Sequence, residues 1–195
     1  FGYANVTEIS LNSSTIEVFQ NATVQCRVQD QHTGENVSGI DVFFYENGAP
    51  IGSAVSNATG VARLSGQFNT TGDQEILCAV QDQPAVYYLA GDVPNATINL
   101  SVTPYTITLQ SPANGSVIDR DSVSVDPDAR ELLVSVPPSV PAGRNITVYA
   151  NLTSPAIAGQ TDLLLGSNLT NSSGQAVIRW DPNASIYAGN YTWWA

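Results

Sequence analysis

The residues with the clearest chemical potential in this sequence are asparagines followed two positions later by serine or threonine. This N-x-S/T sequon is the acceptor pattern for N-linked glycosylation, in which the side-chain amide carries a sugar. Every asparagine except Asn47 begins such a sequon, and none of the sequons has proline in the middle. The sequon asparagines are Asn5, Asn12, Asn21, Asn36, Asn57, Asn69, Asn95, Asn99, Asn114, Asn145, Asn151, Asn168, Asn171, Asn183 and Asn190.

The density of these sequons carries more information than any single one. Serine and threonine are a modest minority of the chain, so chance would place few of them two residues after an asparagine. The alternative is that asparagine, serine and threonine simply serve as turn and strand residues of an all-β chain. The sequence therefore predicts a heavily N-glycosylated, extracellular or cell-surface protein.

A second candidate site is an acidic segment at 114–130. Clustered carboxylates beside an Asn-Gly turn could hold Ca²⁺. The EF-hand spacing and its terminal glutamate are missing, and Arg120 and Arg130 are available to pair with these acids. A calcium site and a solvated acidic loop both remain open, and the candidate ligands are Asp119, Asp121, Asp126 and Asp128.

The sequence contains no catalytic constellation. Its only histidine, His32, falls in a polar loop without a second histidine or a cysteine nearby, so neither a metal site nor a histidine-based nucleophile is expected there. The net charge of −11 argues against nucleic acid as a partner. We predict no enzyme activity, no nucleic-acid partner and no cofactor apart from covalent glycans and the candidate calcium.

Composition and length indicate two exported domains. The 195 residues are 43% hydrophobic, which is enough for two ordinary sandwich cores, and no apolar run is long enough to span a membrane. The chain begins at Phe1 without methionine or a visible signal peptide. We interpret it as a mature, processed chain or as a fragment.

The sequence contains an internal repeat, and each copy includes a sequon in its polar turn. Ile51–Leu64, IGSAVSNATGVARL, recurs as Leu165–Ile178, LGSNLTNSSGQAVI, at the constant offset 165 − 51 = 114. Each copy reads as strand, polar turn and strand, with Gly60 and Gly174 where the turn needs a positive φ. A repeat at domain-sized spacing predicts two copies of one module.

The segment from Val42, VFFYENGAPIGSAVSNATGVARLSG, resembles the core of prokaryotic immunoglobulin-like repeat domains of adhesins, invasin-like proteins and archaeal surface proteins. The matching residues are Val42, Phe44, Tyr45, Asn47, Gly48, Ile51, Gly52, Gly60, Ala62 and Leu64. The resemblance covers most of residues 4–103 and, more weakly, the second half. It implies an all-β protein of two tandem immunoglobulin-like β-sandwiches.

The resemblance also implies a disulfide in the first sandwich. Cys26 and Cys78 fall on inward faces of strands that an immunoglobulin-like fold places in opposite sheets, so a bridge between them is expected. Two buried free thiols are the alternative. In the second half, NITVYANL from Asn145 aligns with NATVQCRV from Asn21, which places Ala150 on Cys26 and Ala195 on Cys78.

We predict domains at residues 1–103 and 131–195, with a connecting segment at 104–130. The second domain has no counterpart of the closing strand at 96–102 and so would expose a sheet edge. Three explanations are open. The protein continues beyond Ala195, another subunit donates the strand, as in donor-strand filaments, or residues 105–125 fold back to close the sheet.

These features favour a structural, N-glycosylated subunit of an archaeal surface layer, sheath or extracellular filament. It would assemble with identical subunits or neighbouring modules through strand edges or domain interfaces. The alternatives are an adhesin stalk that contacts cells or carbohydrate, or an accessory module of a large extracellular enzyme. The aromatic residues that could stack on a sugar are Tyr87, Tyr88, Trp193 and Trp194.

Overall fold

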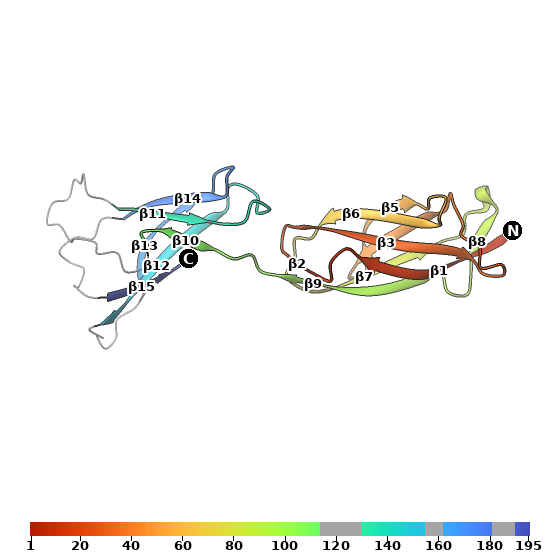
Figure 1. Cartoon of the computed structure of the whole chain (residues 1–195), viewed down its shortest axis with the longest axis horizontal. Coiled ribbons are helices and arrows are strands. Elements are labelled where there is room, and N and C mark those ends of the chain that lie inside the picture. The colour runs from red at the N-terminus through yellow and green to blue at the C-terminus, as the bar shows by residue number, and fades with distance from the viewer. Residues whose placement is uncertain (114–129, 155–161, 181–189) are drawn as a thin grey trace. The chain divides into compact units, whose positions relative to one another are not determined.

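The computed structural model describes residues 1–113, 130–154, 162–180 and 190–195. They form two compact units, Phe1–Pro104 and Tyr105–Ala195, built almost entirely of β-strands (Figure 1). Each unit contains two sheets, so the fold class is all-β with two immunoglobulin-like sandwiches.

The first unit packs a four-stranded sheet, of order β6-β3-β1-β8, against a five-stranded sheet, of order β2-β9-β7-β4-β5. A short 3₁₀ helix, Pro84–Val86, precedes β8. The strands are β1 (Gly2–Leu11), β2 (Thr15–Glu17), β3 (Asn21–Asp30), β4 (Asp41–Glu46), β5 (Ala49–Val55), β6 (Val61–Gln67), β7 (Gly72–Val80), β8 (Tyr88–Ala90) and β9 (Asn95–Thr103).

Alternation of polar and apolar residues sets the core of this unit. In β3, Val24, Cys26 and Val28 are buried, whereas the residues between them lie on the outer face. Phe44 of β4 and Leu100 of β9 come from the opposite sheet and are also fully buried. Period-two patterning therefore places one face of each sheet in a shared core.

The chain changes sheets between β1 and β2, at the polar residues 12–14. β1 pairs with β3, whereas β2 pairs in parallel with β9 of the other sheet. The side chain of Asn12 anchors the crossing, because its Oδ1 accepts a hydrogen bond from the Thr23 N–H at 2.7 Å. The split strand thus closes one side of the sandwich.

The second unit has two three-stranded sheets, of order β10-β11-β14 and β13-β12-β15. Its buried core includes Leu132, Val134, Val148 and Ile178. The strands are β10 (Thr108–Ser111), β11 (Arg130–Ser135), β12 (Asn145–Ser154), β13 (Leu163–Leu169), β14 (Gln175–Trp180) and β15 (Asn190–Trp194).

The repeated sequence forms the same turn in both units. Gly60 and Gly174 have φ values of 71° and 72°, and their N–H groups donate to the carbonyls of Asn57 and Asn171. A Cβ at Gly60 would lie 2.6 Å from the Val28 oxygen, and one at Gly174 would lie 2.7 Å from the Val136 oxygen. Both glycines therefore serve a left-handed turn and a close backbone approach.

The pairing of strands corrects the expected alignment of the second domain with the first. Ala62 of β6 pairs with Cys26, and its repeat partner Ala176 pairs with Val134 of β11. Cys26 thus corresponds to Val134, and the expected match to Ala150 is wrong. β12 takes the place of β4, because it pairs with β13 as β4 pairs with β5.

The expected connecting segment at 104–130 also differs from the structure. Thr108–Ser111 forms β10, which pairs antiparallel with β11 as β1 pairs with β3. This strand lies in the sheet opposite β15, so in the described residues it does not supply the strand that would close the sheet beside β15.

Candidate functional site

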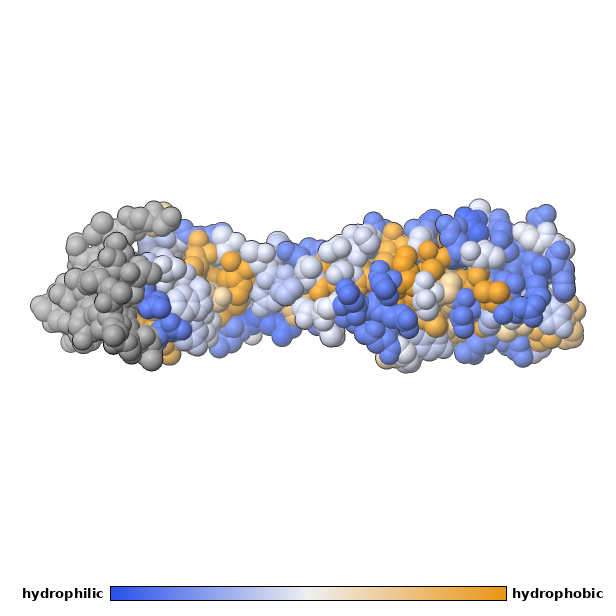
Figure 2. Space-filling model, turned by 90° about the horizontal axis from the view of Figure 1, so that it is seen from below, coloured by the Kyte–Doolittle hydropathy of each residue, from blue (hydrophilic) through white to orange (hydrophobic). Residues whose placement is uncertain are grey.

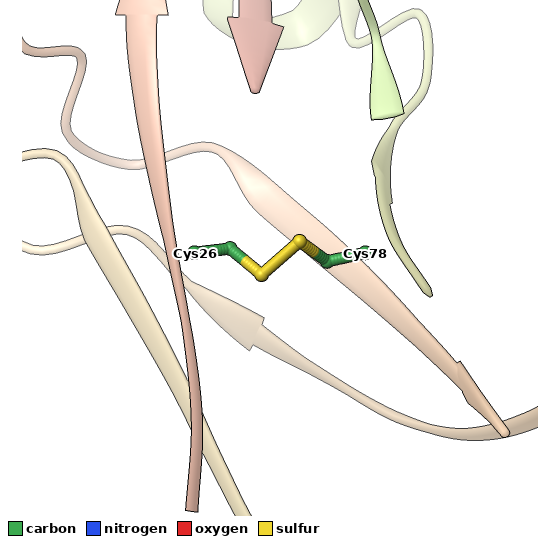
Figure 3. The surroundings of a disulfide bond; sticks show 2 residues. All are labelled: Cys26 and Cys78. Atoms are coloured by element: carbon green, nitrogen blue, oxygen red, sulfur yellow. A yellow bond between two sulfur atoms is a disulfide. The ribbon is translucent and has the colours of Figure 1, made fainter. Parts of the chain in front are cut away.

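The two cysteines are joined across the sandwich of the first unit. Cys26 of β3 and Cys78 of β7 belong to different sheets, and a disulfide connects them at a Cα–Cα distance of 6.6 Å (Figure 3). Both residues are fully buried. This is the pairing that the immunoglobulin-like resemblance implies, and it links the two layers of the core.

The sequon asparagines lie at the surface wherever their side chains are described. Most are exposed, and Asn5 and Asn151 are half-buried. Asn114 and Asn183 and the side chain of Asn190 lie outside the described residues. Figure 2 shows a largely hydrophilic surface on the face it presents, with hydrophobic residues in limited areas. The exposed sequon asparagines are Asn12, Asn21, Asn36, Asn57, Asn69, Asn95, Asn99, Asn145, Asn168 and Asn171.

Two equivalent sequons form the repeated turns. Oδ1 of Asn57 accepts hydrogen bonds from the N–H groups of Thr59 and Val61 at 2.9 and 3.0 Å. Oδ1 of Asn171 accepts from Ser173 and Gln175 at the same distances. In both turns the amide oxygen holds the backbone, and within the described residues Nδ2 donates to no protein atom. That nitrogen is the atom to which a glycan would be attached.

Among the sequons with described side chains, Asn168 is the one whose amide nitrogen donates to a protein atom. Its Nδ2 donates to the carbonyl of Val177 at 2.6 Å. The hydroxyl residue of the same sequon, Thr170, is only 4% exposed and accepts a hydrogen bond from the Arg144 N–H at 3.0 Å. Asn168 therefore differs from Asn171, although the two asparagines are three residues apart.

The turn that holds His32 is structural. The Asp30 carboxylate accepts hydrogen bonds from the N–H groups of Thr33 and His32, which hold the pKa of Asp30 below its ordinary value. Burial and the nearby Asp30 carboxylate raise the pKa of the Tyr88 hydroxyl. The His32 ring packs edge-on against Tyr3 at a centroid distance of 5.7 Å. These contacts tie the turn to β1 and β8.

The aromatic residues singled out in the sequence lie in two places. Tyr87 follows the 3₁₀ helix, has a φ of 64° and is 72% exposed, whereas Tyr88 is half-buried in β8. Trp193 and Trp194 belong to β15, where Trp194 stacks on Tyr149 of β12 at a centroid distance of 6.1 Å. The structure thus gives each unit its own aromatic cluster.

In the described residues, the sheet that was expected to lack its closing strand ends at β15. In the first unit, β7 pairs with β4 on one side and β9 on the other. In the second unit, β15 pairs with β12, and no strand in the described parts of the chain lies on its other side.

The candidate calcium ligands, Asp119, Asp121, Asp126 and Asp128, all lie outside the described residues. Within residues 1–113, 130–154, 162–180 and 190–195, no group of three or more histidine, cysteine, aspartate or glutamate side chains could hold a metal. The described part of the chain also lacks a helix with the length and hydrophobicity needed to cross a membrane. Calcium binding at 114–130 stays a prediction.

No protein-family model and no curated protein matches this sequence. Among similar solved structures, a CARDB domain from Pyrococcus furiosus in complex with di-metal ions has 21% identity and a TM-score of 0.42, covering 53% of this chain and 90% of that one. The adhesin InvE of Yersinia pseudotuberculosis has 16% identity and a TM-score of 0.42, covering 92% and 53%. The D0-D1 domain of intimin has 13% identity and a TM-score of 0.38, covering 91% and 85%.

All three identities lie below 25% and all three TM-scores below 0.5. The likeness concerns the fold alone, because one fold hosts many functions.

Proposed function

We propose that this chain is a pair of structural modules from a heavily N-glycosylated archaeal surface layer, sheath or extracellular filament, and that it has no enzymatic role. The observation that carries the proposal is that no sequon asparagine with a described side chain is buried. The archaeal assignment rests on the combination of a prokaryotic module type with dense N-linked sequons. The expected location is outside the cell.

The mechanism would be mechanical and protective. The disulfide links the sheets of the first sandwich, and glycans would hydrate a surface with few charged residues. Assembly would proceed through strand edges or domain interfaces, with a strand from an identical subunit or a neighbouring module added to a sheet. Such pairing would join units through main-chain hydrogen bonds, which do not depend on a specific side chain.

Attachment of each glycan would require an activated sugar donor. Nδ2 of the asparagine would displace a phosphate leaving group from the anomeric carbon of the donor and lose one proton. This step forms a C–N bond and breaks a C–O bond, without oxidation or reduction. Asn57 and Asn171 are exposed, and their turns are held through Oδ1, so each Nδ2 is suited to this step.

Electron cryo-microscopy of the native cell surface or of purified assemblies would test the structural role. We expect a regular layer or fibre in which density for sugars projects from the exposed sequons, and a strand paired along β15. A full-length native protein that stays a monodisperse monomer, without any ordered assembly, would contradict the proposal.

A carbohydrate-binding adhesin stalk is the second candidate, and the exposed Tyr87 favours it. Tyr87 has a positive φ, which is uncommon for a residue other than glycine, and it is 72% exposed. Strained backbone conformations of this kind are enriched at functional sites. Glycan-array binding that is lost in Tyr87→Ala would support this function. Trp194→Ala, in the other unit, would show whether the second aromatic cluster takes part.

A further inference from the structure

A row of apolar side chains lies on the outer face of the β4-containing sheet in the first unit. Phe44 is buried in the core, so the next residue, Tyr45, faces outward. Tyr45 pairs with Leu77 of β7, and Leu77 pairs with Thr97 of β9. Tyr45 and Leu77 are each half-buried, although no described element covers this face. We call these two residues the first row.

The same row recurs in the second unit. Tyr149 of β12 pairs with Trp194 of β15, and the two rings stack with an interplanar angle of 20°. Tyr149 also pairs with Leu164, which is the repeat partner of Pro50 beside Tyr45. Leu164 is 59% exposed and Trp194 is 37% exposed. We call Tyr149 and Trp194 the second row.

Sequon asparagines border both rows on the same face. Asn95 and Asn99 flank Thr97 along β9, so each is a diagonal neighbour of Leu77, at a Cβ separation of about 7 Å. Asn151 follows Tyr149 by two positions along β12, which also separates their Cβ atoms by about 7 Å. An asparagine side chain with its first sugar ring spans such a distance.

We propose that the N-linked glycans on Asn95 and Asn99 pack over the first row, and that the glycan on Asn151 packs over the second. The proposal rests on the proposed glycosylation and specifies where the sugars lie. A pyranose ring has one face of C–H groups, which suits an aromatic or leucine side chain, and its hydroxyls remain in water. Covering an exposed apolar patch in this way removes apolar surface from water.

The position of the sequons also argues against a protein partner on this face. Glycans on Asn95 and Asn99 would occupy the space beside Leu77, so a second copy of the chain would have to displace them before it could contact the first row. The occupant that the sequence itself supplies is therefore the carbohydrate on the same strand.

Hydroxyl-radical footprinting of the glycoprotein from its own host, read by mass spectrometry, tests this inference. The double variant Asn95→Gln/Asn99→Gln is expected to increase labelling of Tyr45 several-fold and to leave Tyr149 unchanged. Asn151→Gln is expected to do the reverse, so each unit is a control for the other. Asn69→Gln removes an exposed sequon from the loop between β6 and β7, outside the strands that form either row, and should change neither tyrosine.

Glycopeptides in the same spectra separate the possible failures. Unmodified Asn95, Asn99 and Asn151 would overturn the inference together with the proposed glycosylation of this face. Modified asparagines with unchanged tyrosine labelling would overturn the inference alone. Enzymatic deglycosylation of the folded wild-type protein should expose both tyrosines without any substitution. Protection that survives deglycosylation and disappears on dilution would identify a second copy as the occupant and contradict the proposal.

Discussion

At the scale of single residues, equivalent asparagine side chains stabilise the repeated turn in both units. Oδ1 of Asn57 and of Asn171 closes the repeated turn, and a glycan on Nδ2 leaves that oxygen free to do so. The residue before each of these asparagines is also polar and buried. Ser56 accepts a hydrogen bond from the Ile40 N–H, and Thr170 accepts one from Arg144, both at 3.0 Å.

The contrast between Asn168 and Asn171 leads to a prediction about two neighbouring sequons. Asn171 should carry a glycan, whereas Asn168 should remain unmodified, because its Nδ2 and the Thr170 hydroxyl are both engaged in the folded chain. Site-resolved glycopeptide mass spectrometry measures both occupancies. High occupancy at Asn168 would show that attachment does not act on the folded hairpin.

At the scale of elements, the turn glycines should be sensitive to a single methyl group. Gly60→Ala is expected to destabilise the first unit by at least about 1–2 kcal/mol, because alanine is disfavoured at positive φ and its Cβ would lie 2.6 Å from the Val28 oxygen. Gly66→Ala in β6 is the matched control, since a Cβ there would have no neighbour within 4 Å and the φ of Gly66 is not positive. Denaturant unfolding compares the two variants, and equal stability would contradict the account.

The disulfide should contribute strongly to the first unit. Replacing both cysteines, Cys26→Ala with Cys78→Ala, is expected to lower its free energy of unfolding by about 4 kcal/mol on the chain-entropy estimate for a loop of this length. The closed loop has a sequence separation of 52 residues. Thermal unfolding of the double variant measures the loss. An unchanged midpoint would mean that the sandwich does not depend on this link.

Much of the element pattern could be predicted from the sequence, because period-two alternation and Asn-Gly or Asn-x-x-Gly turns are local signals. The strand–turn–strand units around Asn57 and Asn171 follow from them. Correspondence between the units could not be derived so directly. β3 and β4 alternate alike, so the N-x-T-V text at Asn145 matched β3, although β12 pairs as β4 does.

At the scale of the whole molecule, the two units share a plan but differ in the number of strands that the structure describes. The first has a five-stranded sheet in which β9 pairs with β7. The corresponding sheet of the second unit has three described strands. The lengths of the connecting loops also differ between the units, so no constant offset relates all strands. Long-range pairing of this kind depends on the tertiary structure, and the sequence repeat covers only the hairpin that both units retain.

The central claim is that these sandwiches are held in a carbohydrate-covered surface structure. Glycopeptide mapping of the native protein tests it most directly, with intact mass measured before and after deglycosylation. The account predicts sugars on most exposed sequons, including Asn57, Asn95, Asn99 and Asn171. A native protein whose polypeptide mass is unmodified, with free asparagine at all of these positions, would contradict it.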